Sequence, residues 1–76
     1  MPYSHVAIRI IKDGELFATY KPNKYVGMGF LEETTQDFVT SIHAKESVVA
    51  IVYNTRTMKE LFRKTRWIEK ENDEAS

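Results

Sequence analysis

Among the side chains that bind transition metals strongly, this chain has two histidines and no cysteine. His5 lies at the start of a predicted strand, and His43 lies near the end of a predicted helix. A zinc site needs three or four converging ligands, usually with one closely spaced pair, and the two histidines form no such pair. The sequence therefore predicts no metal site and no cofactor.

A nucleophile and a base can be drawn from Ser41 and His43, with Asp37 nearby. On a helix, however, positions 41 and 43 differ by about 200° in direction, so these two side chains point apart. The neighbouring carboxylates of Glu32 and Glu33 lie at a helix start, where the helix dipole favours acidic groups. The sequence therefore predicts that the protein is not an enzyme.

Gly27 and Gly29 precede a predicted helix and resemble part of a phosphate-binding loop. A dinucleotide fingerprint needs a third glycine at position 32, where this chain has Glu32 followed by Glu33. These carboxylates compete with a phosphate for the same backbone donors. We interpret residues 25–30 as a tight connection that packs against the core.

The charge pattern near the C-terminus gives the strongest functional signal. Residues 55–68 carry five basic side chains and one acidic one, net +4, whereas residues 69–76 carry net −3. On a helix all of these basic residues except Lys64 fall within roughly 80° of one another, with the single tryptophan at the edge of this basic face. The predicted partner-binding residues are Arg56, Lys59, Arg63, Arg66 and Trp67.

Tryptophan and arginine are strongly enriched at binding hot spots. We therefore predict a small non-enzymatic binding protein, of the regulator or inhibitor type, that binds another protein through this basic face. The alternative is nucleic-acid binding through the same helix, because a tryptophan among arginines also offers a stacking surface for bases. The zero net charge and the acidic tail argue against that alternative. Two further interpretations stay open: a subunit of a larger assembly, and a solvated basic face with Trp67 folded back onto the domain.

The elements that position these residues centre on Ser47–Tyr53, a short apolar run rich in β-branched side chains. Such side chains pack well on a pleated surface, and the run has the length of a strand. Because it is apolar on both faces, we predict a central strand that is covered on both sides. A first helix covers one side, and a second helix or a second copy of the chain covers the other.

A β-hairpin is predicted from about Ser4 to Lys21. Its first strand alternates with period two, which separates an apolar face from one that carries Arg9. Asp13-Gly14 then favours a type I′ turn, because both residues tolerate positive φ.

Two helices complete the predicted fold. The first runs from about Thr35 to Ala44, capped by Thr34 or Thr35. The second runs from about Met58 to Lys70, where a capping-box pattern precedes apolar residues at helical spacing. The predicted fold is α+β in the order β-β-α-β-α, with a three-stranded, mainly antiparallel sheet of strand order 2-1-3.

The length of 76 residues fits one small domain. We predict a single domain over residues 1–70 and a disordered acidic tail over residues 71–76. The chain begins with Met, has no signal-peptide pattern and lacks the apolar stretch of about 20 residues that a membrane span needs. We expect a complete cytoplasmic protein that does not bind membranes and whose partner is another protein, with a homodimer as a further option.

Overall fold

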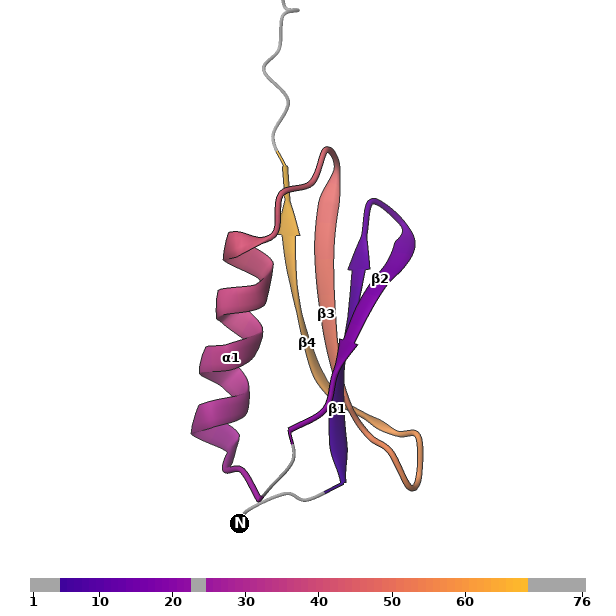
Figure 1. The fold of residues 1–76 in the computed structure, drawn as a ribbon, viewed down its shortest axis with the longest axis vertical. Coiled ribbons are helices and arrows are strands. Elements are labelled where there is room, and N and C mark those ends of the chain that lie inside the picture. The colour runs from indigo at the N-terminus through magenta and orange to yellow at the C-terminus, as the bar shows by residue number, and fades with distance from the viewer. Residues whose placement is uncertain (1–4, 23–24, 69–76) are drawn as a thin grey trace, which may run out of the picture.

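A computed structural model describes residues 5–22 and 25–68 and shows one helix packed on a four-stranded antiparallel sheet (Figure 1). The elements follow the order β1 (Val6–Lys12), β2 (Glu15–Tyr20), α1 (Met28–Ser41), β3 (Ser47–Asn54) and β4 (Glu60–Trp67). The strand order in the sheet is β2-β1-β3-β4. The small α+β domain and the neighbours 2-1-3 are as predicted, but a fourth strand stands where the sequence pattern predicts a second helix.

The core lies between α1 and the two central strands. Alternate residues of β1 and of β3 point toward the helix, and the six of them that form the core layer are at most 4% exposed. They meet Leu31, Thr35 and Val39 of α1, which are also buried. The strand residues that form this layer are Val6, Ile8, Ile10, Val48, Ala50 and Val52.

The helix begins at Met28, seven residues before the predicted start at Thr35, and it ends at Ser41 rather than Ala44. Gly27 is the N-cap residue, and its carbonyl accepts a hydrogen bond of 3.1 Å from the Leu31 N–H. Thr35 is fully buried and its hydroxyl bonds the Leu31 carbonyl, so it is a core residue and not a cap. The earlier start is favoured because it adds Leu31 to the buried stripe. The segment interpreted as a tight connection therefore supplies the first turn of α1.

The second predicted helix is wrong, because residues 60–67 form β4 and pair antiparallel with β3. One edge of β3 is satisfied by β1, and a helix at this point would leave the other edge of a buried strand without hydrogen-bond partners. The helical spacing of the apolar residues does not correspond to a buried helix face, because two of them, Met58 and Leu61, are exposed. Lys64 and Arg66, in contrast, are only partly exposed and lie on the side of the sheet that faces α1, paired with Ala50 and Val48.

The two turns of the sheet differ in type. Asp13 and Gly14 have φ angles of 52° and 85°, in accord with the predicted positive-φ turn between β1 and β2. The β3–β4 connection is longer and is organised by Asn54, whose side-chain oxygen accepts from the N–H groups of Arg56 and Thr57 at 2.8 and 3.0 Å. Met58 in this connection adopts a left-handed φ of 64°.

Some predictions fall outside the described residues, namely the acidic tail 71–76, Ser4 at the hairpin start and the end of the predicted second helix at Lys70. Within residues 5–22 and 25–68, no helix has the length and apolar character needed to cross a membrane.

Candidate functional site

The sheet has one face against α1 and an opposite face that no element of the described chain covers (Figure 1). Residues that alternate with the core layer point to this second face. Residues that are paired on neighbouring strands point to the same face, so the register identifies the side chains that each strand contributes. We call this surface the open face. Its residues are Ala7, Arg9, Ile11, Leu16, Thr19, Val49, Ile51, Tyr53, Glu60, Arg63, Thr65 and Trp67.

The register arranges the open face in rows across the sheet. One row runs Leu16, Ile11, Val49 and Thr65 and is apolar except at its end. The next row runs Thr19, Arg9, Ile51 and Arg63, so an arginine stands on each side of Ile51. Trp67 lies beyond the apolar row, paired with Ser47, and is 76% exposed. The open face thus joins an apolar half to a half that carries two arginines.

Arg9 is held against an aromatic ring on the open face. Its guanidinium carbon lies 4.7 Å from the centroid of Tyr53, and its Nη2 donates to the Tyr53 hydroxyl at 3.4 Å. Tyr53 itself is 8% exposed. The contact holds the guanidinium over the Tyr53 ring, and a guanidinium can bind a planar acceptor or stack on another ring.

Arg63 is held by an acidic neighbour on the same strand. Its Nε and Nη2 donate to the two carboxylate oxygens of Glu60 at 3.0 and 2.7 Å, a bidentate pair. This hydrogen bond lowers the pKa of Glu60 and raises the pKa of Arg63. Both side chains remain substantially exposed, so the pair orients Arg63 rather than contributing much to stability.

The five residues predicted to bind a partner do not share one surface. Arg63 and Trp67 lie on the open face, four residues or about 13 Å apart along β4. Arg66 points to the opposite face, where its guanidinium donates to the carbonyls of Val39 and Ile42 at the end of α1. Arg56 and Lys59 lie exposed in the β3–β4 connection.

The structure adds residues to the site that the helical interpretation missed. Arg9, Ile11, Val49, Ile51 and Tyr53 join Arg63 and Trp67 because β1 and β3 lie beside β4. The period-two pattern of β1 already separates Arg9 and Ile11 from the core residues. A strand assignment for residues 60–67 is the missing step, since it places Arg63 in the same row as Arg9.

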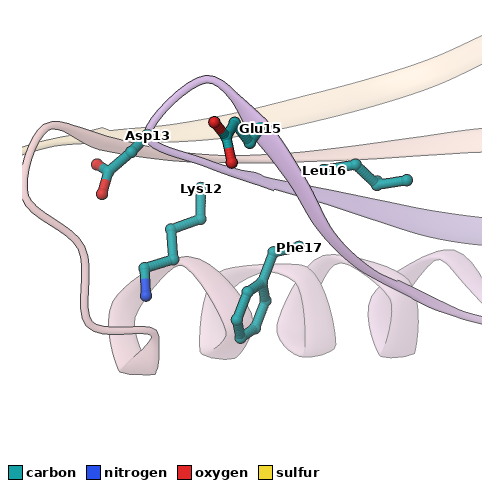
Figure 2. Close-up of a pocket in the computed structure, with 5 residues that line it drawn as sticks. All are labelled: Lys12, Asp13, Glu15, Leu16 and Phe17. Atoms are coloured by element: carbon teal, nitrogen blue, oxygen red, sulfur yellow. The ribbon is translucent and has the colours of Figure 1, made fainter.

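A separate hollow of 340 Å³ lies at the tip of the β1–β2 hairpin and is lined by Lys12, Asp13, Glu15, Leu16 and Phe17 (Figure 2). Lys12 and Phe17 lie together on one side of the hairpin, with the Lys12 Nζ 5.2 Å from the ring centroid. The Asp13 carboxylate accepts from the backbone N–H groups of Lys45, Glu46 and Ser47, so it holds the α1–β3 connection. These carboxylate bonds lower the pKa of Asp13, that from Lys45 most.

The open face offers apolar, aromatic and charged side chains that can bind a partner. Across the described residues, no group of three or more potential ligands comes together to bind a metal. Comparisons of the chain with protein-family models, with curated proteins and with solved structures find no match.

Proposed function

We propose that this protein is a small non-enzymatic binding protein of the regulator or inhibitor type, which binds another protein through the open face of its sheet. The carrying observation is the exposure of Trp67, at 76%, beside an apolar row and two oriented arginines that no described element covers. Exposed apolar surface rimmed by polar groups marks interaction sites, and tryptophan with arginine dominates hot spots.

The size of the open face suits a protein interface. Four strands spaced about 4.8 Å apart and about eight residues long give a projected area of roughly 500 Å². Side-chain relief raises the accessible area toward the roughly 800 Å² per partner of standard complexes. We place the protein in the cytoplasm as part of this proposal, because the absence of cysteine fits a reducing compartment.

The test is capture of partners by the wild-type chain and by the double variant Arg63→Glu with Trp67→Ala, from nuclease-treated lysate of the source cells. The matched control is Lys45→Glu with Tyr25→Ala, which reverses one exposed lysine and removes one aromatic ring that is 71% exposed. Neither residue belongs to the open face. We expect a protein that is retained by the wild type and by the control but lost with the open-face variant.

Two results overturn the proposal. The first is a retained protein that the open-face variant still binds. The second is unfolding of that variant, checked by circular dichroism and urea denaturation, since Trp67 would then be part of the core. Capture of tagged chain by untagged chain, lost in the variant, assigns the open face to a second copy of the protein.

Nucleic-acid binding is the second candidate, and the aromatic and arginine content of the open face favours it. Arg9 over Tyr53 together with the exposed Trp67 resembles the stacking surface that single strands use. Its signature is affinity that falls steeply between low and moderate salt, measured with a labelled oligonucleotide. Binding that is absent or independent of salt excludes this candidate.

A further inference from the structure

We propose that β2 pairs with β2 of a second copy of the chain. The two strands run antiparallel about a two-fold axis near Ala18, so that two four-stranded sheets become one continuous sheet of eight strands. The inference uses an edge of the sheet and not its open face, so it is independent of the proposed function. Such an isologous interface is the commonest symmetry among soluble homo-oligomers.

The first argument is that β2 is an apolar edge strand. It lies at one end of the sheet, and none of the strands formed by the described residues lies along its outer side (Figure 1). Residues 16–20 contain neither a charged residue nor a proline, and Leu16 and Phe17 are 64% and 55% exposed. An exposed apolar edge with free backbone groups is a template for pairing with another chain.

The opposite edge of the same sheet is protected. β4 carries Arg63, Lys64 and Arg66 along its length. Charged side chains are a usual means by which proteins block an edge. Strand pairing between copies is therefore directed to β2.

The second argument is that β2 is complementary to itself in charge. Glu15 begins the strand and Lys21 follows it, and Ala18 lies midway between them. Antiparallel pairing brings the acidic start of each strand beside the basic end of the other, whereas parallel pairing brings like charges together. Neither side chain forms an ion pair with another described residue. Pro22, which has no N–H to donate, marks the end of the segment that can pair.

The third argument is the hollow at the hairpin tip. The register shift opposite Ile10 and Ile11 makes Phe17 an extra residue, and its ring lies beside Lys12 on the side of the hairpin that faces α1 (Figure 2). In the antiparallel pair centred on Ala18, Phe17 lies opposite Thr19 of the second copy and one residue from that copy's Tyr20. Within each chain, Tyr20 packs against Phe38 at 5.5 Å between ring centroids. The second copy thus covers the Phe17 ring, which α1 of the same chain leaves exposed. The bulge limits the regular ladder to a few residues, so the dimer is weak and forms at high protein concentration.

The chain has no cysteine, so a single introduced one reports on proximity between copies. Cβ atoms of directly opposed residues lie about 4.5–5.5 Å apart, close to disulfide distance. We expect Ala18→Cys to form a covalent dimer rapidly under mild oxidation. Thr40→Cys on the exposed side of α1 and Thr65→Cys on the open face are the controls. Oxidation of Ala18→Cys no faster than that of Thr40→Cys overturns the inference.

A charge exchange tests the orientation independently of disulfide chemistry. Glu15→Lys and Lys21→Glu each place like charges together, and we expect each to raise the dimer dissociation constant about tenfold. The double variant, and an equimolar mixture of the two single variants, restore opposite charges and should dimerise as the wild type does in sedimentation velocity. Single variants that dimerise like the wild type overturn the inference. Faster crosslinking of Thr65→Cys than of Ala18→Cys does so as well, because it assigns the contact to the open face.

Discussion

The two hairpins of this sheet differ in their turns and in how closely α1 packs against their strands. The β1–β2 hairpin closes with a two-residue turn, Asp13-Gly14, and its second strand is exposed at nearly every residue. The β3–β4 hairpin closes with a longer connection, and α1 packs directly against both of its strands. The first hairpin is therefore closed by a tight turn and has an uncovered second strand, whereas α1 packs against both strands of the other hairpin.

The same difference separates the attachments to α1. β4 is attached by Arg66, which donates to the Val39 and Ile42 carbonyls that the helix itself leaves unpaired at its end. The β1–β2 hairpin is attached at its turn by Asp13, which bonds the connection after α1 rather than the helix. Its β2 strand reaches α1 through the edge contact between Tyr20 and Phe38. We infer that the β3–β4 hairpin is attached to α1 more firmly than the β2 strand is.

The largest expected effect contrasts a covered and an uncovered side chain. Val52→Ala removes two methyl groups from a fully buried site on β3, and we expect it to lower the free energy of unfolding by about 2–3 kcal/mol. Phe17→Ala on β2 should cost less than about 1 kcal/mol, because the ring is largely exposed. Urea denaturation at low protein concentration measures both. Equal losses would show that β2 is packed as firmly as β3.

The next effect contrasts two arginines of β4. Arg66→Met keeps an apolar stem but removes both bonds to the helix end, and we expect a loss of about 2 kcal/mol. Arg63→Met breaks only the exposed pair with Glu60 and should unfold at nearly the wild-type urea concentration. If Arg63→Met is the more destabilising of the two, Arg63 has a structural role that the open-face proposal does not allow.

A smaller effect concerns pH and the turn of the first hairpin. The backbone N–H of Lys45, and then that of Glu46, lower the pKa of Asp13 below its usual 3.8. A pKa that is lower in the folded state means that Asp13 stabilises the fold above about pH 4, and that this stabilisation is lost as the pH falls further. Asp13→Asn should therefore flatten the decline in stability at acidic pH, measured by urea denaturation across that range.

Two variants sharpen this prediction about Asp13. Asp37→Asn, on the exposed side of α1, should keep the acid sensitivity of the wild type. Glu60→Gln should change it at low salt and much less at high salt, since the Glu60–Arg63 pair is exposed and screened. An Asp13→Asn protein with the full wild-type decline would mean that Asp13 does not hold the α1–β3 connection.

The smallest effect is a gain in stability at the second turn. Met58 has a left-handed φ of 64°, which costs a residue with a Cβ atom about 1–2 kcal/mol. Met58→Gly removes that cost but adds backbone freedom to the unfolded chain, so we expect a net gain of about 0.5–1 kcal/mol. Gly14→Ala in the first turn, where φ is 85°, is the matched change and should destabilise. A loss with Met58→Gly would show that the side chain makes contacts that outweigh the strain.

Much of the first hairpin and of the central strand can be predicted from local sequence. Alternating residues in β1, the Asp13-Gly14 turn and the β-branched run of β3 each specify one conformation, and all three agree with the structure. The start of α1 is less predictable, because Gly27 caps it without a side-chain bond and Thr35 has the residue type of a cap but a buried position. Capping patterns mark a helix start only where the hydroxyl is free to reach the first turn.

The candidate site is predictable in its residue types but not in its arrangement. Arg63 and Trp67 are recognisable from the sequence as hot-spot residues, and both lie on the open face. Arg66 cannot be separated from them by residue type, since only the neighbouring end of α1 turns it into a structural residue. Arg9 and Tyr53 join the site through strand pairing between residues more than forty positions apart.

The sequence by itself determined the local conformations of the first hairpin and of the central strand, and with them the α+β class. It could do so because turn chemistry and side-chain period act between near neighbours. What only the tertiary structure decided is the conformation of residues 60–67. Their apolar spacing suits a helix, but β3 is a buried strand with one unpaired edge, and pairing that edge makes a strand the lower in free energy. That long-range requirement also selects which face Arg63 and Trp67 occupy, and so places them opposite α1 beside Arg9.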